Sequence, residues 1–196
     1  MHQSRIRPDD ALIVVDVQRD FCLGGALPIG GGDEVVPILN EWIDAARASG
    51  ARIILSRDWH PLDHVSFRQR GGPWPQHCVQ NSEGAGFHPQ LHIPPAARIV
   101  NKGTACDRDN YSDFDGTDLA LELRTEGVRR LWIGGLAQDV CVRATVLDAC
   151  QLGFETHLIS PGTRPVDEEQ GRKAIAEMRT AGAIIEQEDP YESVAV

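Results

Sequence analysis

Residues 130–142 read RLWIGGLAQDVCV, and this stretch decides the fold class. Its first part is a short, nearly continuous apolar run of the kind that forms a strand covered on both faces. The run leads through a turn into a helix-like segment at 139–152, in which Val140, Ala144 and Leu147 lie along one stripe. A strand that passes through a turn into a helix is the unit of a parallel α/β sheet.

The same alternation recurs along the whole chain. Helix-like segments lie at 33–49, 117–127 and 167–181, and the outer two are followed by glycine at the C-terminal boundary. The pattern predicts one domain over residues 1–196, an α/β three-layer, doubly wound sandwich with a mainly parallel six-stranded sheet. Five further strand-like runs lie at 11–16, 51–56, 97–102, 155–160 and 182–187.

Composition excludes several classes of function. The net charge of −10 over 196 residues disfavours nucleic acid as a partner, because binding to phosphates requires concentrated Lys and Arg. No apolar run approaches the roughly 20 residues of a membrane helix, and the N-terminus lacks a signal-type segment, so we expect a cytoplasmic protein with no membrane contact. Five cysteines, an odd and widely spaced set, are expected to be free thiols. A small-molecule substrate is the expected partner, and the sequence leaves a homo-oligomer open.

Four reactive side chains follow the predicted strands. Asp16, Asp58 and Lys102 end the first three strands, and Cys141 lies in the turn after the fourth. Each alone has an ordinary explanation as a turn, rim or core residue. Because parallel strands end at one edge of a sheet, we expect an acid, an ammonium and a thiol to meet there. Lys102 and the start of the helix would favour the thiolate form of Cys141. Asp16 would accept the proton of the thiol and return it to a leaving group, and backbone amides of the turn would hold an oxyanion.

The loop at 57–96 contains a second group of polar residues. The motif DWHPLDH places Asp58 and His60 on the same side of an extended chain, and His77 follows later in the loop. One carboxylate and two imidazoles form a site for one divalent metal ion, and zinc is favoured over iron or manganese. His64 is either a further ligand or a neighbour of the ligands. The alternative is that these loop histidines have a surface or structural role. We expect such a role for the remaining histidines, His2, His88, His92 and His157.

Five segments, taken in order, resemble the nicotinamidase branch of the isochorismatase-like cysteine hydrolases. They span nearly the whole chain and contain the D-x-Q-x-D-F, D-W-H-P, W-P-x-H-C, lysine and G-x-A-x-D-x-C-V motifs of that family. The segments are VVDVQRDFCLGGALPI, SRDWHPLDHVSF, GGPWPQHCVQNSEGAGFHPQL, NKGT and GGLAQDVCV.

The resemblance implies an activity and a role for each motif. The implied reaction is hydrolysis of nicotinamide to nicotinic acid and ammonia through a thioester, a step of NAD salvage. The implied catalytic triad is Asp16, Lys102 and Cys141, and a cis peptide bond is implied before Ala137. The amides of Ala137 and Cys141 would hold the oxyanion. The remaining implied residues are the metal ligands Asp58, His60 and His77 and the substrate-binding aromatics Phe21, Trp74 and Tyr111.

Two alternatives remain at this point. A related hydrolase would act on another small amide or on isochorismate, but the metal ligands argue against it. A thiol or metal sensor would keep the fold without turnover, but the intact set of Asp16, Lys102 and Cys141 argues against that role.

Overall fold

Six parallel strands form one sheet in the order β3-β2-β1-β4-β5-β6. The computed structural model describes residues 5–187 and 190. All five strand pairs in this part of the chain are parallel, so the predicted α/β sheet is confirmed, and it is parallel throughout. The strands are β1 (Asp10–Val15), β2 (Arg52–Asp58), β3 (Arg98–Lys102), β4 (Arg130–Leu136), β5 (Glu155–Arg164) and β6 (Ile184–Glu186).

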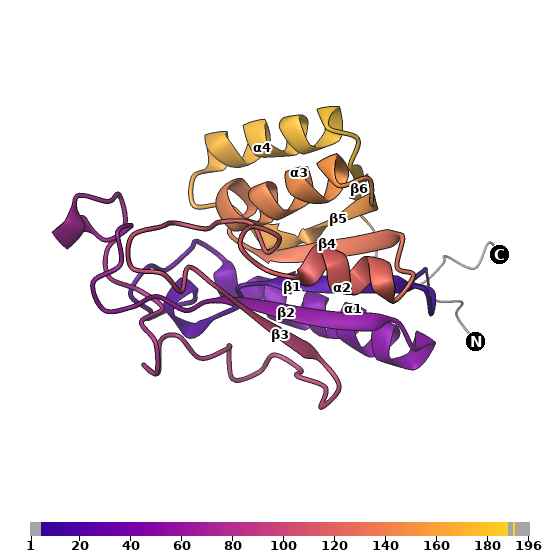
Figure 1. Ribbon diagram of the computed structural model, residues 1–196, viewed down its shortest axis with the longest axis horizontal. Coiled ribbons are helices and arrows are strands. Elements are labelled where there is room, and N and C mark those ends of the chain that lie inside the picture. Colours follow the sequence, from indigo (N-terminus) through magenta and orange to yellow (C-terminus); the bar gives the residue numbers. More distant parts are fainter. Residues whose placement is uncertain (1–4, 188–189, 191–196) are drawn as a thin grey trace.

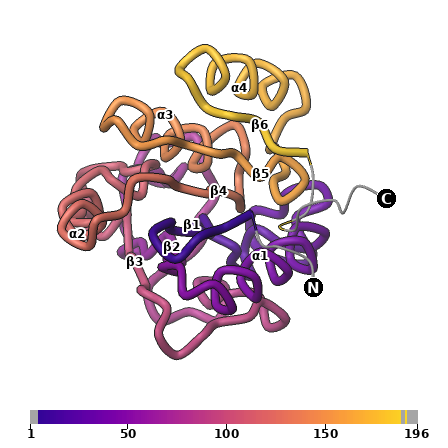
Figure 2. The backbone as a smooth tube through the Cα atoms, turned by 90° about the vertical axis from the view of Figure 1, so that its right-hand side faces the viewer, coloured from indigo at the N-terminus to yellow at the C-terminus, as the bar shows by residue number. Residues whose placement is uncertain are grey.

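Helices cover both faces of the sheet, which confirms the predicted three layers. Figure 2 shows α1 on one side of the row of strands and the other three α-helices on the opposite side. Within residues 5–187, none of the helices combines the length and apolar character that a bilayer crossing requires. The four are α1 (Val35–Ser49), α2 (Leu119–Thr125), α3 (Arg143–Gln151) and α4 (Glu168–Thr180).

Strand β1 lies at the centre and is buried along its whole length. Its side chains alternate between two cores: Leu12 and Val14 pack in the core under α1, and Ile13 packs in the core under the other three helices. A strand that is buried on both faces cannot alternate apolar with polar residues. The continuous apolar run in the sequence therefore reflects its central position.

Most elements begin and end within two residues of their predicted bounds, and two differ by more. The predicted helix at 139–152 begins with a wide turn at Gln138–Val142, in which the Val142 amide donates to the Ala137 carbonyl at 3.0 Å, and α3 follows it. Strand β5 continues to Arg164, beyond the apolar run at 155–160. A shift in the β4–β5 register between Ile133 and Gly135 allows this extension. Neither the wide turn nor the shift has a signal in hydrophobic periodicity.

The connection between β2 and β3 is the long loop predicted at 57–96. It extends beyond the ends of the strands at the left of Figure 1. Backbone hydrogen bonds order it: the His60 amide donates to the Cys78 carbonyl at 2.9 Å, and the Gln80 amide donates to the His60 carbonyl at 2.8 Å. The loop therefore holds its histidines in a defined place at the carboxyl edge of the sheet.

The close approach of β4 to β1 gives a stability prediction. Gly135 has φ +130°, and a Cβ there would lie 2.0 Å from the carbonyl oxygen of Val15. Gly135→Ala is expected to lower the free energy of unfolding by about 3 kcal/mol or more, or to prevent folding. Gly153→Ala is the control, because φ is +84° but no atom lies within 4 Å, so only about 1–2 kcal/mol is at stake. Urea unfolding that gave equal losses would contradict this account of the β1–β4 contact.

Candidate active site

The Lys102 ammonium lies at the centre of the site and is buried. Its Nζ lies 2.5 Å from an oxygen of Asp16, 2.5 Å from an oxygen of Asp58 and 3.3 Å from Sγ of Cys141. Burial acts to lower the pKa of Lys102, but the two carboxylates outweigh burial and raise the pKa well above its usual value. The side chain is therefore a permanent cation that joins the thiol to both acids.

Asp16 follows β1 in a left-handed conformation, with φ 48°. Its carboxylate accepts a hydrogen bond from the Ser56 hydroxyl at 2.9 Å. Burial raises the pKa of Asp16 to about 6, although Lys102 acts in the opposite direction. A carboxyl oxygen of Asp16 and Sγ of Cys141 lie within 4.8 Å of each other. Asp16 thus lies beside the thiol, and the pKa of its carboxyl is near neutrality, as general acid–base chemistry requires.

Cys141 lies in the wide turn before α3 and is buried. Burial raises its pKa well above the usual value, and the nearby Lys102 only partly opposes this. The sequence argument counted the cation and the helix start, which favour a thiolate, and did not include burial. In the structure the thiol keeps its proton until a base removes it.

The turn that carries Cys141 is anchored from two sides. The peptide bond between Leu136 and Ala137 is cis, in agreement with the expectation from the resemblance. The Asp139 carboxylate accepts hydrogen bonds from the amides of Val166 and Asp167, at 2.8 and 3.1 Å. These contacts fasten the turn to the segment just before α4.

Asp58, His60 and His77 come together as a buried triplet whose ligand atoms lie within 4.8 Å of one another. An oxygen of Asp58 lies 3.5 Å from Nε2 of His60 and 3.9 Å from Nε2 of His77. The Nδ1 atoms contact the carbonyls of Gly103 and Pro75 at 3.0 and 2.8 Å, which leaves both Nε2 atoms facing Asp58. Carbonyl contacts of this kind orient metal-binding imidazoles, so the residues fit a divalent ion.

His64 lies beside the triplet and its ring nitrogens already have partners. Nδ1 contacts the Ser66 hydroxyl at 2.8 Å, and Nε2 contacts the Arg108 carbonyl at 3.0 Å. The ring stacks on His60 with centroids 4.1 Å apart. Of the two roles left open by the sequence, the geometry favours a neighbour that fixes His60. Phe67, which sequence reasoning missed, packs edge-on against three of the histidine rings.

A cavity opens between the Cys141 thiol and the triplet of Asp58, His60 and His77. Phe21, Trp74 and Tyr111, the three predicted aromatics, all line it. The Trp74 indole donates to the Tyr111 hydroxyl at 3.2 Å, so these two rings hold each other in place. Asp16 and Lys102 do not line the cavity and lie behind Cys141. Apolar lining residues that the sequence argument missed are Leu27, Ile29, Val140 and Val166.

Asp113 is a buried acid that sequence reasoning also missed. Neither of its carboxyl oxygens has a hydrogen-bond partner within the described part of the chain. Burial raises its pKa well above the usual value, and the charge of Asp16 adds to the shift. A carboxyl in such surroundings keeps its proton. In the sequence it lies in a polar loop at 103–115, where an acid is ordinarily exposed.

The fold and the site together define a class of protein, the parallel α/β proteins with a buried cysteine, lysine and aspartate beside a triplet of potential metal ligands. The sequence profile of the isochorismatase domain family matches residues 10–189, and the chain belongs to this family. The resemblance stated from the five motifs is therefore confirmed.

Several named relatives align with nearly the whole chain. A nicotinamidase of Escherichia coli (strain K12) is 40% identical over 201 residues, which cover 91% of this chain and 94% of the relative. The structure of a pyrazinamidase of Pyrococcus horikoshii in complex with zinc has a TM-score of 0.89 and 49% identity, and the match covers 92% of this chain and 100% of that one. The structure of PnC1 from L. infantum in complex with nicotinate has a TM-score of 0.86 and 35% identity over 95% of this chain and 96% of that one.

The two kinds of histidine in the loop give a metal-binding prediction. His77→Ala is expected to bind one zinc equivalent fewer than the parent protein, because Nε2 of His77 faces Asp58. His64→Ala should keep that equivalent with an affinity weakened by about 10- to 100-fold, the usual effect of losing a residue that orients a ligand. Zinc titration of metal-stripped protein measures both. Loss of the equivalent in His64→Ala would make His64 a ligand.

Asp113 gives a prediction about stability and pH. A carboxyl whose pKa is raised by folding holds its proton in the native state after the unfolded chain has lost it, so its presence lowers stability as pH rises. Asp113→Asn removes this effect and keeps the shape of the side chain. The free energy of unfolding of the variant, relative to the parent, is expected to increase from about pH 5 to about pH 8. A pH-independent difference in urea unfolding would show that Asp113 is ionised in the folded protein.

Proposed function

We propose that this protein hydrolyses nicotinamide to nicotinic acid and ammonia. The observation that carries the proposal is the cavity in which Cys141, backed by Asp16 and Lys102, faces aromatic side chains and a metal-ligand triplet. The identity of the E. coli relative as a nicotinamidase and the nicotinate in the L. infantum structure support the choice of a pyridine carboxamide.

In the first half of the reaction, Asp16 accepts the proton of the Cys141 thiol. The thiolate attacks the amide carbon, and the amides of Ala137 and Cys141 stabilise the oxyanion. Asp16 then returns the proton to the amide nitrogen as the carbon–nitrogen bond breaks. Ammonia leaves, and the acyl group remains on Cys141 as a thioester.

In the second half, water replaces ammonia. Asp16 accepts a proton from the water as its oxygen attacks the thioester carbon. The carbon–sulfur bond breaks, Cys141 recovers a proton from Asp16, and nicotinic acid leaves. Lys102 keeps its charge throughout, which stabilises the anionic forms of Asp16 and Cys141 in a buried site.

We propose Asp58, His60 and His77 as the residues that hold one metal ion, with zinc as the ion. The donor set of one carboxylate and two imidazoles and the zinc in the P. horikoshii structure support this choice. When bound, the ion supplies a positive charge to anchor the ring nitrogen. Phe21, Trp74 and Tyr111 provide the apolar surfaces on which the ring rests.

A cytoplasmic role in NAD salvage is part of the proposal. All five cysteines are free thiols, which suits a reducing compartment.

Replacing the proposed nucleophile tests the function directly. Cys141→Ala is expected to lower ammonia release from nicotinamide by about a thousandfold or more while the protein still folds. Asp16→Asn should be similarly damaging, because an amide cannot carry the proton between thiol and leaving group.

Cys150→Ala, on α3 and away from the cavity, is the matched control and should keep full activity. Circular dichroism establishes that each variant is folded. Turnover of Cys141→Ala within about tenfold of the parent would exclude the thioester route. Absence of ammonia release by the parent protein would exclude nicotinamide as the substrate.

A further inference from the structure

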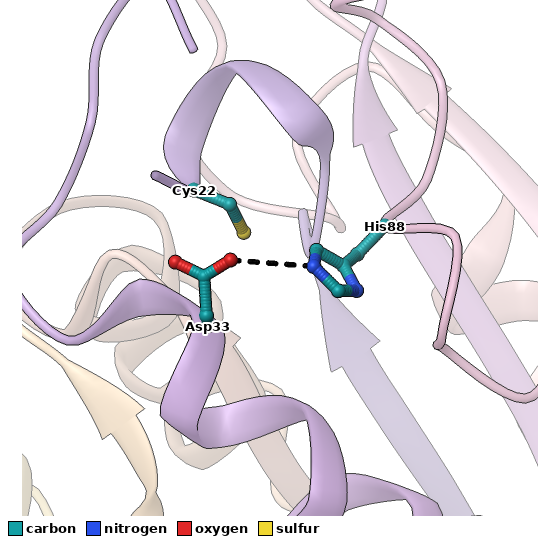
Figure 3. A group of neighbouring side chains, drawn as sticks. All are labelled: Cys22, Asp33 and His88. Atoms are coloured by element: carbon teal, nitrogen blue, oxygen red, sulfur yellow. Dashed lines mark ion pairs between the residues drawn. The ribbon is translucent and has the colours of Figure 1, made fainter. Parts of the chain in front are cut away.

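A second cluster of metal-binding side chains lies outside the proposed active site. Figure 3 shows Cys22, Asp33 and His88, which come from three separate segments and point toward one another. The thiol sulfur, a carboxylate oxygen and a ring nitrogen lie within 4.8 Å of one another. We propose that these three residues bind a second divalent metal ion of the zinc type.

The spacing of the cluster suits a tetrahedral ion. Bonds of about 2.0 to 2.3 Å to a tetrahedral zinc ion place neighbouring ligand atoms about 3.3 to 3.6 Å apart. Nε2 of His88 lies 3.3 Å from an oxygen of Asp33. This separation is close to the 3.5 Å between Asp58 and His60 in the first triplet. In both groups all three ligand atoms lie within 4.8 Å of one another.

Neighbouring backbone groups hold the proposed ligands in place. The Leu23 amide donates to the second oxygen of Asp33 at 2.8 Å and leaves the first oxygen facing His88. Cys22 is buried, and its amide donates to the Arg19 carbonyl at 3.1 Å. Carboxylates and thiols oriented in this way require little rearrangement to bind an ion.

The ligand set also indicates which ions fit. A cysteine sulfur selects zinc-like ions over magnesium or calcium, which prefer oxygen ligands. A surface depression of about 420 Å³ adjoins the cluster and is lined by all three residues. A water molecule from this depression can occupy a fourth position, so the proposed site is open and its ion exchangeable.

Binding requires a defined movement of protons. The Gln90 amide donates to Nδ1 of His88 at 3.2 Å, so in the metal-free protein Nε2 carries the ring proton and faces Asp33. On binding, the ring proton moves to Nδ1 and the Gln90 contact opens, which leaves the imidazole neutral. The Cys22 sulfur–hydrogen bond breaks, a sulfur–metal bond forms, and one proton passes to water.

The position of the cluster suggests what the ion does. Cys22 follows Phe21, which lines the active-site cavity. Asp33 lies in the short helical turn Gly32–Glu34 that leads into α1, and His88 belongs to the long loop between β2 and β3. An ion held by all three ties these segments together beside the cavity without contacting Cys141. The second site is thus a structural clamp, and it does not depend on the proposed reaction.

Cobalt binding to the metal-stripped full chain tests the proposal. In a Cys141→Ala background, which removes the thiol that shares a cavity with the first site, we expect two equivalents of Co²⁺ and a thiolate-to-cobalt absorption in the near ultraviolet. Cys22→Ser and His88→Gln should each lose one equivalent, and Cys22→Ser should also lose the absorption. Circular dichroism verifies folding, and His88→Gln, at the rim of the cluster, serves if Cys22→Ser does not fold.

His92→Gln is the matched control. Nδ1 of His92 lies 3.3 Å from an oxygen of Asp44, the same separation as in the His88–Asp33 pair. Among the described residues, His92 and Asp44 belong to none of the groups that could hold a metal ion. The His92→Gln variant should therefore keep both equivalents and the absorption. Binding of a single equivalent without the absorption by the Cys141→Ala protein, or two equivalents in both Cys22→Ser and His88→Gln, would overturn the second site. A single equivalent with an absorption that Cys22→Ser loses would instead overturn the metal site at Asp58, His60 and His77. Ammonia release by the parent protein is measured separately, so either proposal can fail alone.

Discussion

The buried ammonium of Lys102 is the interaction on which the site depends. It lies between two carboxylates and a thiol, and all four groups are buried. Charges in such a place are tolerable only when each has a partner, so loss of the cation would leave Asp16 and Asp58 uncompensated. The same ammonium also joins the two groups that the sequence presents separately. Asp16 belongs to the proposed triad and Asp58 to the proposed metal site, and Lys102 holds both.

The parallel sheet explains how these side chains meet. Asp58 and Lys102 are register partners on neighbouring strands, and Asp16 follows the next strand in the sheet. Cys141 then enters from the turn after β4, which pairs with the other side of β1. Residues far apart in the chain thus become neighbours because their strands end at one edge. The loops add the histidines and the aromatic walls above this edge.

The sequence predicted the features that a local pattern of residues determines. Continuous apolar runs predicted the strands, and the residue type after each run predicted the meeting of Asp16, Lys102 and Cys141. The sequence did not predict features that arise only when distant segments pack together. Burial of Asp113 depends on how the 103–115 loop folds over the sheet, and the contact of Phe67 with the histidines depends on the path of the β2–β3 loop. The protonated state of Cys141 is a result of the same kind, since burial has no local signature.

The burial of Cys141 has a consequence for chemical damage. Peroxides and alkylating reagents attack the thiolate and react slowly with the protonated thiol. Because burial raises the pKa of Cys141 well above its usual value, this thiol is expected to react slowly with such reagents. Cys106, by contrast, is exposed on the surface and meets them first. Under oxidation, the buried thiol of the proposed nucleophile is therefore expected to outlast the exposed one, in a protein whose five cysteines are all free.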